Sequence, residues 1–210
     1  MTIDKNDLLN SILSSISRID YVKSADIPNI DLYMDQVTSF VEKQLKSTKR
    51  NAEDKVLTKT MINNYAKNDL LPAPVKKKYS KEHLLLLILI YYFKNILSMK
   101  DIETLLAPIT ERYFQTTGKA DISRIYDEVC AHEKDRTDLL QQDIALLYNN
   151  SKETFTDLEG EDQQVLQNFS FICSLSFDVY VKKLLIEKLI DEFPDRQKKE
   201  KDKKNGSAEK

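Results

Sequence analysis

The chain has 210 residues, enough for one domain or two small ones with a hydrophobic core. Apolar residues make up 41% and charged residues 31%, which is typical of globular proteins, and only 3 glycines and 5 prolines favour helices over sheets. The net charge of −2 is unevenly distributed, because residues 35–100 carry 13 basic and 6 acidic side chains whereas residues 101–195 carry 9 and 20. We therefore expect a polyanion to bind the first segment only.

The first half of the chain is predicted to form several helices joined by polar segments. Residues 5–19 have the apolar spacing of an amphipathic helix, and a second helix should begin near Ile30 and end near Leu45. Residues 46–55 are polar and charged and should form a loop. Thr58 is a suitable N-cap for a short helix that ends near Asp69.

A stiff basic connector, NDLLPAPVKKKYS (68–80), follows this short helix. Its two prolines restrict their own φ angles and favour extended backbone at the residues before them. We expect the connector to project Lys76, Lys77 and Lys78 together, so that they neutralise phosphates without reading a base sequence. The alternative is a solvated loop that only keeps the protein soluble.

The remaining segments are also predicted to be helical. Ser80 should cap a helix that ends near Ile96, and Ser98 one that ends at Leu106, before Pro108. Apolar residues over 122–147 fit one long helix or two, and a last helix should cover about 162–193. Residues 195–210 are basic and poor in apolar side chains, so disorder is expected there. The predicted fold class is all-α.

Several functional classes are not supported by the sequence. The start of the chain does not resemble a signal peptide, and the apolar run LLLLILIYYF (84–93) is about half the length that a membrane span needs, so we expect a cytoplasmic protein without a membrane partner. Such a run has no polar face and must be covered on both sides, by other helices or a second subunit. Cys130 and Cys173 lie far apart, as do the two histidines, so neither a metal nor another cofactor is expected. His83 is expected at the surface, at the start of a helix. No nucleotide-binding or hydrolase motif is present, and we expect no enzyme.

The helix over 58–69 has two different faces. Ile62, Tyr65 and Ala66 form an apolar stripe that should pack inward, while polar residues lie mostly on the other side. Asparagine can pair with adenine through two hydrogen bonds, and threonine or lysine can reach bases or phosphates in the major groove. The polar face consists of Lys59, Thr60, Asn63, Asn64 and Lys67.

The segment 57–106 resembles the winged helix-turn-helix of MerR-type transcription regulators. The shared landmarks, in the family's order and nearly at its spacing, are Tyr65, Leu70-Leu71-Pro72-Ala73-Pro74, Tyr79-Ser80, Leu84, Leu87, Ser98, Ile102, Leu105 and Leu106. The match covers about a quarter of the chain. The whole chain also resembles an uncharacterised bacterial domain-of-unknown-function family that carries such a module before a helical C-terminal half.

This resemblance implies a bacterial regulator that binds double-stranded promoter DNA as a homodimer. It divides the chain into an amino-terminal helix (1–30), a MerR-like winged helix-turn-helix domain (31–107), a helical dimerisation or effector domain (108–194) and a basic tail (195–210). An effector, if there is one, would be an unknown ligand. The candidate DNA-binding residues are Lys59, Thr60, Asn63, Asn64, Tyr65, Lys67, Lys76, Lys77, Lys78 and Tyr79.

Three features depart from the family pattern. Thr60 and Asn63 stand where arginines are common, the wing is shorter by several residues, and the loop 46–55 replaces a short turn. These features leave open an alternative function, a helical protein-interaction module that kept the fold but not specific DNA binding.

Overall fold

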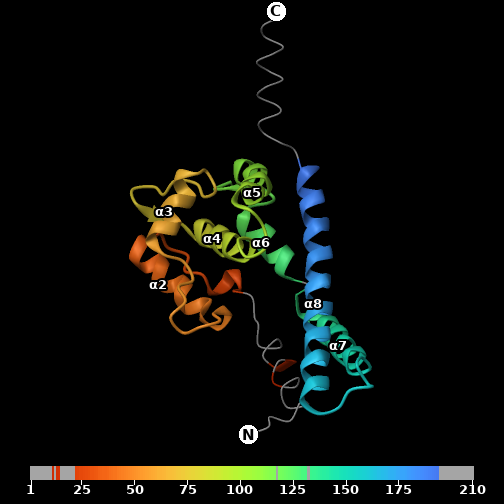
Figure 1. Ribbon diagram of the computed structural model, residues 1–210. Coiled ribbons are helices and arrows are strands. Elements are labelled where there is room, and N and C mark those ends of the chain that lie inside the picture. Colours follow the sequence, from red (N-terminus) through yellow and green to blue (C-terminus); the bar gives the residue numbers. More distant parts are fainter. Residues whose placement is uncertain (1–10, 12, 15–21, 117, 132, 194–210) are drawn as a thin grey trace, which may run out of the picture. The chain divides into compact units, whose positions relative to one another are not determined.

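The structure, a computed structural model, describes residues 11, 13–14, 22–116, 118–131 and 133–193. These residues are mostly helical (Figure 1), as the sequence predicted. They fall into two compact units, one containing residues 22–127 and 185–193 and the other residues 11, 13–14 and 128–184. These limits differ from the sequence-based divisions at residues 30 and 107. Most of the helix predicted over 5–19 lies outside the described residues. The whole tail 195–210 also lies outside them.

Helices account for nearly all of the regular structure in the described residues. The elements in chain order are the 3-10 helix η1 (Ser24–Asp26), β1 (Leu32–Tyr33), α2 (Met34–Gln44), the 3-10 helix η2 (Lys46–Thr48), α3 (Lys59–Lys67), β2 (Lys78–Tyr79), α4 (Lys81–Phe93), α5 (Met99–Tyr113), α6 (Ile122–Cys130), α7 (Glu133–Lys152) and α8 (Gly160–Asp191). The apolar residues predicted to form one long helix or two over 122–147 therefore belong to two helices, α6 and α7.

The two strands join the beginning of the first unit to the connector after α3. β1 pairs with β2 in antiparallel orientation, with Leu32 opposite Tyr79 and Tyr33 opposite Lys78. Leu32 and Tyr79 are buried, whereas Tyr33 is exposed, as expected for side chains that alternate across a strand. This pairing brings together residues that are far apart in the sequence, and the composition of the chain did not predict it.

Helix α4 forms the centre of the first unit. The side chains from Leu84 to Ile88, and that of Ile90, are completely buried, whereas Leu89, Tyr92 and Phe93 are partly exposed, so most of the run 84–93 is covered. At the start of α4 the carboxylate of Glu82 accepts a hydrogen bond of 2.6 Å from the backbone N–H of Gln115. Burial raises the pKa of Glu82, although hydrogen bonds from backbone N–H groups oppose that rise.

Helix α5 continues through Pro108 to Tyr113, although the sequence placed the end of a helix at Leu106. A proline inside a helix removes one backbone hydrogen bond. The hydroxyl of Thr110, in the turn after the proline, donates to the carbonyl oxygens of Leu106 and Ala107 at 3.1 and 3.0 Å. Proline in a helix therefore did not mark the end of this element.

Helix α6 packs against the first residues of the same unit. The buried hydroxyl of Tyr126 donates to the carbonyl oxygen of Val22 at 2.6 Å, and the hydroxyl of Ser24 donates to Asp127 at 2.7 Å. Both bonds join residues more than 100 positions apart. They explain why the compact unit begins at residue 22 and continues well beyond residue 107.

In the second unit, α7 and the first half of α8 form a helical hairpin. The rings of Tyr148 and Phe171 meet edge to face, with centroids 5.4 Å apart. The side-chain amide of Gln167 donates to the carbonyl oxygens of Lys152 and Thr154, at 2.8 and 3.1 Å, and so satisfies acceptors at the end of α7. Residues 167 and 171 therefore define the face of α8 that lies against α7.

Candidate nucleic-acid interface

Helix α3 is a short amphipathic helix with a well-defined start. The hydroxyl of Thr58 accepts a hydrogen bond of 3.2 Å from the backbone N–H of Met61, as its predicted role as N-cap requires. Ile62 is completely buried and anchors the inner face. The five polar candidates Lys59, Thr60, Asn63, Asn64 and Lys67 are all exposed. The exposed side of α3 is therefore the polar side that the sequence predicted.

Two of the ten candidate residues are core residues instead. Tyr65 and Tyr79 are only 5% and 3% exposed, and burial raises the pKa of both hydroxyls. The carbonyl oxygen of Tyr65 accepts hydrogen bonds from the N–H groups of Leu70 and Leu71, at 3.0 and 3.2 Å, which end the helix and start the connector. The two tyrosines therefore position the polar surface and do not belong to it.

The three lysines of the connector lie at a tight hairpin. The backbone N–H of Val75 donates to the carbonyl oxygen of Lys78 at 3.1 Å, and the N–H of Lys78 donates to the carbonyl oxygen of Val75 at 2.9 Å. Lys76 and Lys77 form the two-residue tip, with φ angles of 50° and 65°, in the left-handed region that asparagine and glycine prefer in such turns. Both side chains are exposed at the tip.

Ion pairs and ring contacts hold some cations of this surface. Lys59, at the start of α3, forms an ion pair with Asp35 of α2. The ammonium group of Lys78 lies 5.2 Å from the centroid of the Tyr33 ring, across the two-stranded sheet. Lys76, Lys77 and Lys67 have no hydrogen bond or ion pair with any residue that the structure describes. The tip of the hairpin and the end of α3 therefore carry the cations that are free to bind an anion.

His83 lies in the core, although the sequence predicted a surface position. It is 1% exposed, and its ring meets those of Tyr79 and Phe114 edge to face, with centroids 5.5 and 4.8 Å away. Its Nδ1 accepts a hydrogen bond of 3.0 Å from the backbone N–H of Ser80, so the imidazole completes a capping box at the start of α4. Burial lowers the pKa of His83. The spacing Ser-x-x-His at a helix start was the signal for this role.

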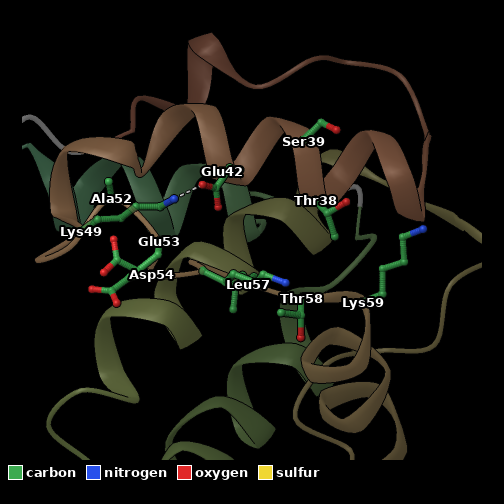
Figure 2. Close-up of a pocket in the computed structure, with 11 residues that line it drawn as sticks. Thr38, Ser39, Glu42, Lys49, Ala52, Glu53, Asp54, Leu57, Thr58 and Lys59 are labelled. Carbon is green, nitrogen blue, oxygen red and sulfur yellow. Dashed lines mark hydrogen bonds and ion pairs between the residues drawn. The ribbon is translucent and has the colours of Figure 1, made fainter.

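A hollow of about 510 Å³ lies between α2 and the segment that leads to α3 (Figure 2). Figure 2 shows the ammonium group of Lys49 directed at the carboxylate of Glu42, and the two form an ion pair. The same carboxylate accepts the backbone N–H of Val56 at 3.4 Å, and the bond from Lys49 is the main cause that lowers the pKa of Glu42. These contacts connect the long loop to α2.

In the part of the chain that the structure describes, no group of three or more histidine, cysteine, aspartate or glutamate side chains is arranged to hold a metal ion. The helices that the structure describes include none with the length and apolar character needed to cross a bilayer.

The first unit coincides with a known sequence family. Residues 22–129, half of the chain, match the family described as a domain of unknown function, DUF1836. The match begins where the compact unit begins and ends two residues after residue 127. No curated protein and no solved structure matches the chain significantly. The chain belongs to the DUF1836 family.

Proposed function

We propose that this protein is a DNA-binding transcription regulator of the bacterial cytoplasm, which binds promoter DNA as a homodimer through a MerR-like winged helix-turn-helix. The observation that carries the proposal is the combination of an exposed polar face on α3 with a lysine-tipped hairpin that follows it. A short helix with such a face fits the major groove, and the hairpin supplies charge for the adjacent phosphates.

The order and pairing of the elements support a winged domain. A short strand precedes α2, α3 follows after a loop, and the hairpin then returns as a strand that pairs with the first. Helix α4 begins immediately after that strand. The succession from α3 through the hairpin to α4 agrees with the MerR-type resemblance, in which a basic wing connects the recognition helix to a leucine-rich helix.

We assign base recognition and phosphate contact to different residues, according to their chemistry. Asn63 and Asn64 are the candidates for base recognition, because amides can both donate to and accept from a base edge. Lys76 and Lys77 are the candidates for phosphate contact, because an ammonium group neutralises charge without reading sequence. The ion pair of Lys59 with Asp35 means that Lys59 must exchange a carboxylate for DNA.

An exposed apolar stripe on α8 supports the homodimer. Val165, Phe169, Ile172 and Val179 follow spacings of four, three and seven residues, which place them on one side of the helix. This side lies roughly opposite Gln167 and Phe171, which face α7. A groove of about 340 Å³, lined by Ile172, Leu175, Ser176 and Val179, runs along it. The partner that we propose for this stripe is the same stripe on a second copy of α8.

Exposed apolar side chains are frequent along α8. Ten large apolar side chains of α8 are 39% to 66% exposed: Val165, Phe169, Ile172, Phe177, Val179, Tyr180, Val181, Leu184, Leu185 and Leu189. Only Val165, Phe169, Ile172 and Val179 lie on the stripe, and at roughly 100 Å² each they amount to about 400 Å², which is half of the area per partner in a standard interface.

The test is selection of bound sequences from random double-stranded DNA, followed by gel-shift titrations at several salt concentrations. We expect the selected DNA sequence to be palindromic, since a twofold dimer presents two copies of α3. The variant Lys76→Glu with Lys77→Glu should weaken binding strongly and reduce the salt slope. The control, Lys100→Glu with Lys119→Glu, makes the same change of charge at two exposed positions of the same unit and should bind nearly as the parent does.

Two results would refute the proposal. One is a wild-type protein without DNA affinity even at low salt, and the other is a hairpin variant that binds no differently from the control. The first would favour the alternative, a protein-interaction module. The absence of arginine from α3 and the internal ion pair of Lys59 are the observations that favour that alternative.

A further inference from the structure

A second, more polar hollow lies on the loop between α2 and α3, beside the end of α4. Its volume is about 310 Å³, at the lower end of the range for ligand sites. Four cationic side chains and one carboxylate line it. The lining residues are Thr48, Lys49, Arg50, Asp54, Lys55, Val56, Tyr91, Lys94 and Asn95. Four positive charges against one negative charge make this hollow the natural place for an anion.

The partners of these cations show how much positive charge is left over. Lys49 is paired with Glu42, outside the hollow. Arg50 and Lys55 are exposed and make no hydrogen bond or ion pair with any residue that the structure describes. Lys94 donates to the carbonyl oxygen of Val56 at 3.0 Å, and its ammonium group lies 4.8 Å from the centroid of the Tyr91 ring. Among the described residues, no carboxylate forms an ion pair with Arg50, Lys55 or Lys94, and Asp54 is the one carboxylate in the lining.

Lys94 is the most informative of the three. Its side chain is half-buried, and burial lowers its pKa, which means that the charged form has lost hydration without gaining a counter-ion. A carbonyl oxygen and an aromatic face compensate this loss only in part. An anion in the hollow would supply the missing charge, so the site is electrostatically prepared for one.

Neutral hydrogen-bonding groups complete the lining. The hydroxyls of Thr48 and Tyr91 lie 2.5 Å apart and share a hydrogen bond, and the side-chain amide of Asn95 donates to the carbonyl oxygen of Tyr91 at 3.0 Å. The Thr48 hydroxyl also donates to the carbonyl oxygen of Leu45 at 2.7 Å, so both hydroxyl protons are used, whereas the Asn95 amide has a second N–H to donate. A phosphate group accepts several such bonds together with those of lysine and arginine.

The hollow on the α2 side of the same loop differs in this respect. There Lys49 is paired with Glu42 (Figure 2), and the lining as a whole has three lysines and three carboxylates. The hollow beside α4 shares Lys49, Asp54 and Lys55 with it but adds Arg50 and Lys94, and so has four cations and one carboxylate. The chemistry of the two hollows therefore selects the one beside α4.

We propose that the hollow formed by Arg50, Lys55 and Lys94 binds a phosphate group. The phosphate comes either from a phosphorylated small molecule or from the backbone of bound DNA. Val56 and Leu57 are buried anchors directly before Thr58, the N-cap of α3. A phosphate that joins the loop to α4 would consequently fix the segment from which α3 begins, and a small-molecule phosphate would act as an effector of the proposed regulator.

The test uses the full chain, with the double variant Arg50→Ala and Lys55→Ala. Both side chains are exposed, so the variant should fold as the parent does. The matched control, Lys100→Ala with Lys119→Ala, also removes two exposed cations from the same unit. In one arm, pyrophosphate is titrated by calorimetry at constant ionic strength, with chloride as the reference anion. In the other arm, the salt dependence of DNA affinity is measured by gel shift.

A small-molecule site predicts saturable pyrophosphate binding that the double variant weakens at least tenfold and the control does not. A DNA-backbone site predicts no pyrophosphate binding but a salt slope that falls by about two in the double variant only. If the double variant matches the control in both arms, the phosphate site does not exist. The pyrophosphate titration tests the phosphate site in the absence of DNA. Its result therefore distinguishes a failure of this site from a failure of the proposed DNA binding.

Discussion

The hairpin tip offers the sharpest test of the link between backbone conformation and function. Lys76 and Lys77 occupy two successive left-handed positions, with φ angles of 50° and 65°. For residues with a Cβ atom, this conformation costs about 1–2 kcal/mol each. Replacing the pair by Asn-Gly, the sequence preferred in such turns, should remove most of that cost.

The net gain is smaller than the strain, since glycine loses more conformational entropy on folding, by about 0.5–1 kcal/mol. We therefore expect the variant Lys76→Asn with Lys77→Gly to be more stable by about 1–2 kcal/mol. For a unit of this size, such a gain corresponds to a rise in Tm of roughly 4–12 °C. Thermal and urea denaturation, followed by circular dichroism, measure both quantities.

The control is Lys76→Ala with Lys77→Ala, which removes the same two charges but keeps a Cβ atom at each position. We expect it to be no more stable than the parent, and both variants to lose DNA affinity with a salt slope lower by about two. If Asn-Gly is no more stable than Ala-Ala, the left-handed conformation of the tip does not carry the strain argued here. If both variants bind DNA with the affinity of the parent, whatever their stability, Lys76 and Lys77 do not contact phosphate.

Three further predictions concern other parts of the molecule. Because burial lowers the pKa of His83, the unfolded chain binds the proton first, so the free energy of unfolding should fall as the pH drops below about 6.5. The variant His83→Gln keeps an acceptor for the Ser80 N–H but loses the ring contacts, so urea titrations should find it less stable than the parent at pH 8. Between pH 7 and 5, its free energy of unfolding should change less with pH than that of the parent. An unchanged pH dependence would contradict the role of His83. The variant Asn63→Ala should relax base preference in DNA selection by about 1–3 kcal/mol at one position, whereas Asn149→Ala, on exposed α7, should leave preference intact. The variant Ile172→Glu should convert the dimer to a monomer in analytical ultracentrifugation. The control is Ile30→Glu, at an exposed apolar position outside α8, and if it dissociates the dimer equally, the α8 interface is refuted.

The sequence alone determined the local features of this protein. Thr58 and Ser98 cap helices as predicted, since an N-cap bond joins residues three positions apart and depends on few other contacts. The two faces of α3 were also predictable, because helical periodicity separates Ile62 from Asn63 and Asn64 whatever surrounds the helix. The all-α class followed from composition for the same local reason.

Only the tertiary structure decided which polar residues remain at the surface. Tyr79 and His83 are buried because β2 pairs with β1, 46 residues earlier, and because Phe114 closes over the imidazole ring. The left-handed tip at Lys76 and Lys77 depends on the same pairing, since lysine does not favour such a turn by itself. The cations of Arg50, Lys55 and Lys94 come together because the loop packs on α4. These features arise from contacts between distant residues, and no short-range pattern in the sequence specifies them.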